Sequence, residues 1–290
     1  GLSHIGFKTD TIRIKSLKTL DHIMSVQGKN ELDEVIINQT RKTIKQSFFE
    51  TRNVINVSSE ELLKAACCNL SESFDTNPAI DVNYSDAITG SKQIYMLGLS
   101  SPYIMISEEN IPMVRGASQA YGLEFIPGPW IESIQVIKGS GSVSNGFESI
   151  SGQINYELRK PINERPFYLN IFGSGNGRYE VNTYINKGLG DKLSSGLFIH
   201  ANNRNQKFDN NNDGFLDLPI SKQINLMNRW QYINLEKGWV GFLSSRWMND
   251  KKLIGSVNFN PLFDRGKKLN WGSEIETNRI DSSFKLGYVF

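Results

Sequence analysis

WIESIQVIKGSGSVSNGFESISGQINYELRKP, residues Trp130–Pro161, is the stretch that decides how the fold is interpreted. Its first part, residues 131–137, alternates apolar with polar side chains, which is typical of a β-strand. A turn at residues 139–141 follows, where glycine permits backbone conformations that a Cβ would hinder. Alternation resumes over residues 153–158 and stops at Arg159-Lys160-Pro161. The stretch therefore predicts two strands joined through a glycine-lined turn.

The same stretch resembles the end of the plug domain in TonB-dependent outer-membrane receptors of the Bacteroidetes type. In that family, a segment of the form IE-x-I-E-V-(I/L)-x-G-(P/S) leads through YG-x-x-(A/S)-x-x-G-x-I-N into the first strands of a barrel. The matching residues are Ile131-Glu132, Ile134, Val136-Ile137, Lys138-Gly139, Asn145-Gly146, Ser149–Gly152 and Gln153–Asn155. One glycine-rich turn would be weak evidence, but this many positions in the right order indicate the family.

The composition is compatible with such a receptor. The chain has 290 residues, a net charge of +2, 11% aromatic residues and 25 glycines, which together favour a β-protein with many turns. No apolar run reaches the length of a transmembrane helix, but barrel strands alternate in polarity and average to a hydrophilic score. The net charge argues neither for nor against a nucleic-acid partner, and none is expected.

The resemblance implies three parts. Residues 1–30 are expected to be a short remnant of a carboxypeptidase-regulatory-like β-sandwich with a linker. Residues 31–163 would hold the TonB box and an α+β plug domain. Residues 164–290 would be the first strands of an all-β, antiparallel transmembrane barrel.

The segment before the plug contains a short β-branched run behind two acids, suited to adding as a strand to another protein's sheet edge. Its position in the family implies a TonB box, on which the energy-coupling protein TonB would pull. The residues concerned are Asp33, Glu34, Val35, Ile36 and Ile37. The alternative is an ordinary first strand of the plug.

Within the predicted plug, strands are expected at residues 54–57, 91–99 and 102–106, with helices after Ser58 and near residues 69–74. The chain departs from the family pattern at Leu97 and at Glu109-Asn110. Leu97 stands where the family has arginine, and Glu109-Asn110 where Asp-Gly is common. The first departure removes any role carried over for that arginine.

From Arg165 onward, alternating segments predict barrel strands, with Tyr and Trp suited to the membrane interfaces. Seven segments carry the pattern: residues 168–172, 179–185, 194–200, 224–232, 239–247, 271–277 and 284–288. A receptor barrel has about 22 strands, so an incomplete barrel, unable to transport by itself, is expected. A soluble sandwich or jelly roll would alternate similarly.

A possible calcium loop follows the pattern D-x-[DN]-x-[DN]-G, in which the glycine permits a sharp turn. Its candidate ligands are Asp209, Asn211, Asp213, Phe215 and Asp217, while Ile220 stands where a complete EF-hand has a bidentate glutamate. No cofactor is required by the expected function, and Ca²⁺ would be an addition. The alternative is a polar hairpin loop.

Sulfur-containing side chains suggest a soft-metal site, because thiolates and thioethers prefer Cu(I). The candidates are Cys67, Cys68, Met96, Met105 and Met113. The alternative is that these residues fill the core.

No P-loop, GxSxG, HExxH or CxxC pattern occurs, so an enzyme is not expected. The resemblance implies active import across the outer membrane of a Gram-negative bacterium, with TonB and membrane lipid as partners. The cargo would be a metal chelate (a siderophore, haem, cobalamin or copper complex) or a glycan. The alternative function is a soluble calcium-binding β-protein for adhesion or glycan binding.

Overall fold

The structure, a computed structural model, describes residues 44–47, 54–58, 69–74, 80–85, 89–141, 146–162, 164–267 and 269–289. The chain divides into two compact units, Gly1–Arg41 and Lys42–Phe290, and every described residue belongs to the second. The predictions for residues 1–30, for Asp33–Ile37, for the helix after Ser58 and for Cys67 and Cys68 therefore lie outside the described residues.

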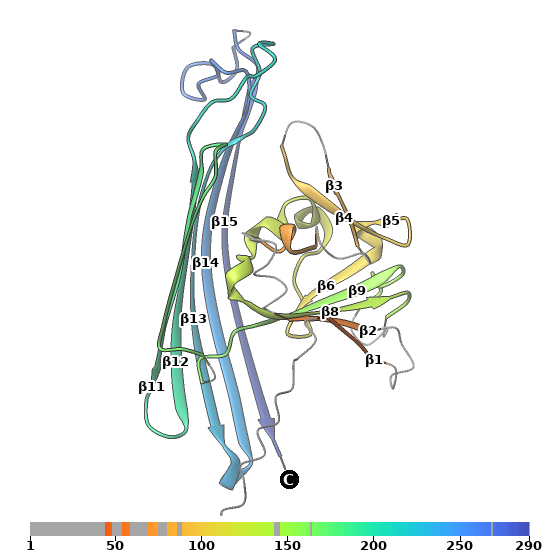
Figure 1. The fold of residues 1–290 in the computed structure, drawn as a ribbon, viewed down its shortest axis with the longest axis vertical. Helices are drawn as coiled ribbons and strands as arrows, with labels where there is room; N and C mark the ends of the chain where they lie inside the picture. The colour runs from red at the N-terminus through yellow and green to blue at the C-terminus, as the bar shows by residue number, and fades with distance from the viewer. Residues whose placement is uncertain are drawn as a thin grey trace, which may run out of the picture. The chain divides into compact units, whose positions relative to one another are not determined.

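A mixed six-stranded sheet forms the centre of an N-terminal module, residues 44–162 (Figure 1). Its strand order is β1(Ile44–Ser47), β2(Val54–Ser58), β8(Ile131–Lys138), β9(Gly152–Leu158), β6(Ile104–Glu108) and β7(Ile111–Pro112). The pairing of β6 with β9 is parallel and the other pairings are antiparallel. The two strands predicted from Trp130–Pro161 are confirmed, and they occupy the middle of the sheet.

A second sheet in this module has three short strands, β3(Asp81–Tyr84), β4(Lys92–Met96) and β5(Leu99–Ser100). The strand predicted over residues 91–99 is confirmed for Lys92–Met96 and ends there, because Leu97 and Gly98 form a two-residue turn with φ of 52° and 79°. The helices of the described residues are short 3-10 turns: η1(Glu72–Phe74), η2(Ser101–Tyr103), η3(Gly116–Ala120), η4(Gly122–Phe125), η5(Gly128–Trp130) and η6(Leu235–Lys237). Among these residues, no helix is long and apolar enough to cross a membrane.

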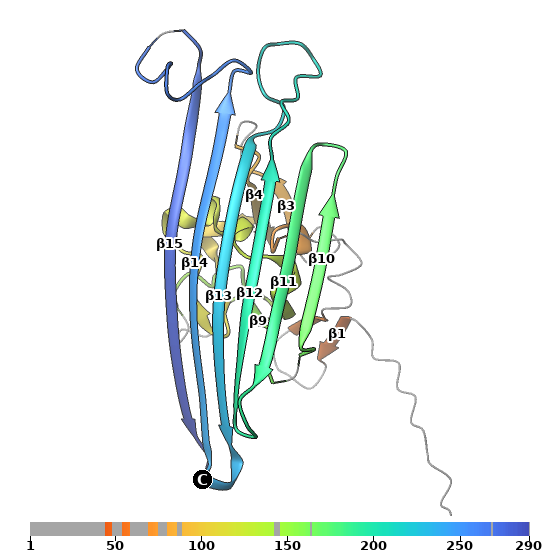
Figure 2. The same ribbon diagram turned by 90° about the vertical axis from the view of Figure 1, so that its left-hand side faces the viewer.

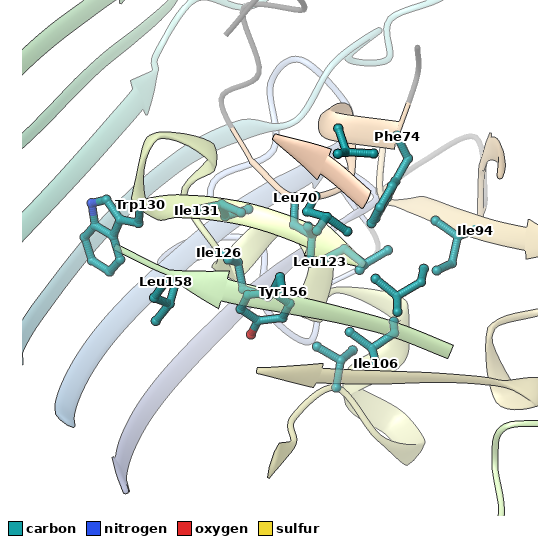
Figure 3. Close-up of a cluster of buried hydrophobic side chains, with 14 of the residues drawn as sticks. Leu70, Phe74, Ile94, Ile106, Leu123, Ile126, Trp130, Ile131, Tyr156 and Leu158 are labelled. Atoms are coloured by element: carbon teal, nitrogen blue, oxygen red, sulfur yellow. The ribbon is translucent and has the colours of Figure 1, made fainter. Parts of the chain in front are cut away.

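The core of the N-terminal module gathers side chains from both sheets and the 3-10 turns (Figure 3). Its largest fully buried members are Trp130, Tyr156 and Phe74. The same cluster includes Tyr184, Phe198 and Met227, which come from later strands. Trp130 meets Phe198 edge to face, with ring centroids 5.9 Å apart. The hydrophobic core is therefore shared between the module and the strands that follow it.

Those later strands form an antiparallel meander, referred to here as the meander sheet (Figure 2). It comprises β10(Phe167–Gly173), β11(Arg178–Gly188), β12(Leu193–Arg204), β13(Ile220–Asn234), β14(Trp239–Gly255) and β15(Gly272–Tyr288). The sheet is open, with β10 and β15 as its edges. The six strands fall within the expected six or seven, but the segments predicted separately at residues 271–277 and 284–288 belong to the single strand β15. The residues between these two segments, 278–283, are mostly polar, so the sequence did not show that the strand continues through them.

The two faces of the meander sheet differ. Inward residues of β11 to β14 are mostly buried and many are polar. The outward face carries apolar rows such as Ile199, Leu226, Trp247 and Ile280, which are neighbours in register. A polar row, Asn203, Lys222, Lys251 and Glu276, borders this face toward the long loops. At the opposite end, the rings of Trp239 and Tyr288 pack 4.9 Å apart. Such an apolar band between polar and aromatic borders is typical of a membrane-facing sheet.

Candidate functional site

The tip of the β6–β7 hairpin places one carboxylate against a buried guanidinium of the meander sheet. Glu108 lies 3.1 Å from Arg246 of β14, and both side chains are nearly buried. The Tyr156 hydroxyl donates a 2.8 Å hydrogen bond to the same carboxylate. Burial raises the pKa of Tyr156 well above its usual range, and the charge of Glu108 adds to this effect. The phenol therefore remains protonated and continues to donate.

The next residue of the hairpin makes two more pairs. Glu109 is ion-paired with Arg229 of β13 and lies 3.6 Å from Lys285 of β15. Glu109 and Asn110 form a two-residue turn with φ of 49° and 67°, the geometry of a type I′ hairpin. The Asn110 N–H donates to Asn155 Oδ1 at 2.8 Å, which holds this turn against β9. The departure from Asp-Gly in the sequence thus supplies a longer carboxylate that reaches the meander sheet.

Two further pairs lie closer to the long loops. Glu124 of η4 is ion-paired with Lys252 of β14. Glu72 of η1 lies 2.6 Å from Arg178 of β11, which also meets Glu180 on its own strand. In each of these pairs with the strands of the meander sheet, the N-terminal module supplies the acid and the sheet supplies the base.

Further hydrogen bonds accompany these pairs, and one of them, from Arg159 to Glu164, is itself an ion pair. The fully buried Asn225 donates to the carbonyl of Phe125 at 2.8 Å. Near the start of the meander sheet, Glu164 accepts from Arg159 and from the Tyr184 hydroxyl, both at 2.8 Å. These directional contacts fix one orientation of the module on the sheet, since a buried charge or amide displaced from its partner is costly.

A polar cleft of about 230 Å³ opens between the module and the meander sheet, next to these pairs. The module lines it with residues of η1, β3, β4 and η4, and the sheet with inward residues of β11 to β14. Gly90 of the module approaches Pro219, which precedes β13, and a Cβ on Gly90 would lie 3.3 Å from that ring. The cleft is therefore built jointly by both parts.

Comparison with known proteins identifies the N-terminal module. Residues 48–153 match the family model "TonB-dependent Receptor Plug Domain". Residues 48–153 are a TonB-dependent receptor plug domain. The match lies within residues 31–163, although the boundaries predicted for the three parts stay predictions. From here on, the N-terminal module is referred to as the plug.

Solved receptors share the fold of the plug together with the first strands. The *Pseudomonas aeruginosa* receptor FpvA, bound to heterologous pyoverdines, superposes with a TM-score of 0.67 at 15% identity over 84% of this chain and 33% of its own. The siderophore receptor PirA of *Acinetobacter baumannii* gives 0.59 at 18% identity, over 80% and 37%. The *Pseudomonas aeruginosa* ferric enterobactin receptor PfeA gives 0.60 at 14% identity, over 80% and 38%. The chain thus spans about a third of the length of these receptors.

The loop predicted to bind calcium connects β12 to β13. Asp209 accepts hydrogen bonds from the N–H groups of Asp213 and Gly214, both at 3.0 Å, and Asp217 accepts from Asn210 at 2.8 Å. The carboxylates therefore cap the loop's own backbone. The described residues contain no group of three or more His, Cys, Asp or Glu side chains placed to hold a metal ion. The structure gives calcium no support, and binding at Asp209, Asn211, Asp213, Phe215 and Asp217 stays a prediction.

The methionines proposed for a soft metal do not converge. Met96 packs in the plug core together with Ile104 and Ile106. Met105 lies between those two residues on β6, so its side chain points to the opposite face of the sheet. Met113 is only partly buried at the edge of the core. This arrangement matches core filling, and copper binding also stays a prediction.

The acid–base contacts between the plug and the meander sheet are absent from the sequence prediction. A signal was available, because Arg178, Arg229, Arg246 and Lys252 occupy the positions of their strands that alternate with outward residues. Charged residues at the inward positions of a barrel indicate contact with water or with a plug. Their individual partners could not be read without the fold.

Proposed function

We propose that this chain works as part of a TonB-dependent outer-membrane transporter that actively imports a metal chelate or a glycan. The plug blocks the path through the barrel, and the cargo binds from the side of the long loops. TonB then pulls on the segment Asp33–Ile37 and displaces the plug. The chain itself performs no covalent chemistry.

The observation that carries this proposal is a plug domain docked on the inner face of a sheet whose outer face is apolar. The inner face carries the bases that pair with Glu72, Glu108, Glu109 and Glu124 of the plug. A soluble adhesion protein, the other function considered, would expose the apolar face to water. A membrane location accounts for the apolar outer face and for the basic inner face that contacts the plug. The fold shared with the similar receptors supports this location.

The ion pairs also suit a plug that must move. Removing it as a whole exposes acids and bases together, so water can solvate both sides, whereas an apolar interface of the same size would regain no such hydration. The pairs therefore favour one docked orientation and allow reversible displacement under force.

The proposal is tested by substituting Val35→Pro, which removes a backbone N–H needed for strand addition to TonB. Energy-dependent uptake is measured in cells with a panel of probes: a ferric tris-catecholate, a ferric trihydroxamate, haem, cobalamin and a maltooligosaccharide. We expect uptake of at least one probe, its loss in Val35→Pro, and its retention in the control Gln39→Pro just beyond the segment. Equal uptake by Val35→Pro and wild type, or a protein found outside the outer membrane, contradicts the proposal.

A further inference from the structure

A pocket of about 210 Å³ lies where the linker between β9 and β10 crosses the β11–β12 hairpin. The turn of this hairpin is at the end of the meander sheet opposite the long loops (Figure 2). Asn186 of β11 fixes the linker to the sheet, because its backbone N–H donates to the Pro166 carbonyl at 2.8 Å and its Nδ2 to the Arg165 carbonyl at 2.9 Å. The pocket is lined by different residues from the polar cleft near the long loops.

Two buried polar atoms of the lining residues have no hydrogen-bond partner in the described part of the chain. They are Oδ1 of Asn186 and Oγ of Ser194, two residues that are only 8% and 3% exposed. Both lie on the inward face and are diagonal neighbours, because Asn186 is opposite Gly196 and Ser194 is opposite Gly188. Leaving a buried donor or acceptor unpaired is costly, so a partner from outside the chain would stabilise both atoms.

The charge of the pocket indicates what kind of group would bind. Among its described lining residues, the ionisable ones are two acids, Glu164 and Asp191. Glu164 is paired with Arg159 at 2.8 Å, whereas the exposed Asp191 has no ion pair with a described residue, and the adjacent Lys192 pairs with Glu236 instead. An amide oxygen can only accept hydrogen bonds. The pocket therefore favours a positively charged group that donates N–H bonds, such as an ammonium or a guanidinium, and disfavours anions.

The rest of the lining is apolar. Ile162 of the linker and Leu193 of β12 line the pocket together with two prolines. Lysine and arginine bury their methylene stems along such surfaces while the charged head reaches polar groups. The pocket is smaller than a typical small-molecule site of about 300–1,000 Å³. Its size and lining therefore suit one long basic side chain.

We propose that this pocket binds a lysine or arginine side chain of a partner protein, with Asn186, Ser194 and Asp191 as its polar contacts. The inference rests on the proposed transport function, which places this end of the sheet in the periplasm, so the partner is a periplasmic protein. A side chain bound there contacts the linker between the plug and β10. The partner would thus hold the receptor at the junction between the plug and the barrel.

The test is a titration of the native gene product, purified in detergent, followed by saturation-transfer NMR of the probe. The probes are a capped pentapeptide with one lysine between glycines, the same peptide with norleucine in place of lysine, and butylammonium. We expect saturable binding of the lysine peptide, at about millimolar affinity, and binding of the norleucine peptide about tenfold weaker or less, because only the ammonium donates to the pocket.

Two substitutions locate the binding. Ser194→Ala should weaken binding of the lysine peptide about three- to tenfold, and Asp191→Asn, in an exposed turn, about two- to fivefold. An unchanged midpoint of urea unfolding shows that each variant keeps its fold. The matched control is Glu236→Gln, which removes a charge from the adjacent turn, where the side chain is 82% exposed, and should leave the affinity unchanged.

Equal binding of the lysine and norleucine peptides overturns the proposal, and so does equal affinity of wild type, Ser194→Ala and Asp191→Asn. The absence of saturable binding assigns the pocket to water and overturns it as well. Butylammonium that binds more tightly than the lysine peptide assigns the pocket to free amines and excludes the protein partner. These titrations require neither cargo nor TonB, so their failure is distinguishable from failure of the uptake test with Val35→Pro.

Discussion

The pair Glu108–Arg246 shows how a single contact can hold the plug in position. The two side chains lie 3.1 Å apart and are nearly buried, and the Tyr156 hydroxyl completes the coordination of the carboxylate. Breaking a buried pair by removing one partner commonly costs about 3–5 kcal/mol, because the remaining charge stays buried. Exposed pairs contribute about 0–1 kcal/mol.

Glu108→Gln should therefore destabilise the docked plug by about 3 kcal/mol, a little less if Asp281, 3.5 Å from Arg246, takes over part of the pairing. Urea titration of the purified protein, followed by tryptophan fluorescence, measures this. The matched control is Glu157→Gln, which breaks the more exposed pair with Lys160 at 3.1 Å. If Glu108→Gln lowers the free energy of unfolding no more than Glu157→Gln does, the pairing of Arg246 with Glu108 does not stabilise the docked plug.

At the scale of elements, the two short hairpins of the plug both turn through residues with positive φ. In the β4–β5 hairpin, Leu97 adopts a φ of 52°. The residue is 66% exposed, so little packing offsets the strain of this conformation. A branched, apolar residue in this region is strained by about 1–2 kcal/mol, whereas asparagine tolerates it.

Leu97→Asn should therefore raise the free energy of unfolding by about 0.5–1 kcal/mol, with no loss of buried contacts. The midpoint of thermal or urea unfolding reports this change. Leu99→Asn, on the adjoining strand with ordinary φ, serves as the control and should give a small loss. A decrease in stability for Leu97→Asn would mean that the exposed leucine makes contacts which outweigh the strain.

The strands were largely predictable because alternation follows from the pleat, but their ends were not. Alternation around Ile280 continues through Arg279 and Asp281, which point inward and pair with each other at 2.7 Å. Charged residues at these positions indicate a loop if a strand is expected to alternate apolar side chains with uncharged polar ones. The structure extends β15 through them, since an inward position facing the plug can carry a charge.

The candidate site was less predictable than the fold. The bases of the meander sheet and the acids of the plug stand more than a hundred positions apart in several pairs, such as Glu124 with Lys252. Their matching depends on how the plug docks, which no local pattern encodes.

For the whole molecule, the apolar outward face of the meander sheet provides a test of the proposed membrane location. Leu226 lies in an apolar row with Ile199, Trp247 and Ile280. Leu226→Arg should destabilise the membrane-inserted protein by about 2–4 kcal/mol, because the charge would face the hydrocarbon. Folding into lipid vesicles at increasing urea concentration measures the effect.

The matched control is Asn203→Arg, in the polar row beside Lys222, where the cost should be about 0–1 kcal/mol. Equal effects of both substitutions would argue against a lipid environment for this face. If only Leu226→Arg lowers the stability, the apolar row lies in the hydrocarbon layer and the polar row lies at its border.

The strand order of the plug also constrains how the chain is made. The strands β2 and β6 do not pair with each other, and both join the sheet only through β8 and β9. The sheet therefore cannot assemble until Leu158 has been synthesised, just before β10 begins. Until then, β2 and β6 each present an unpaired edge, which is a site for aggregation with other chains. Trp130–Pro161 is thus the last part of the plug to emerge and the part that closes its sheet.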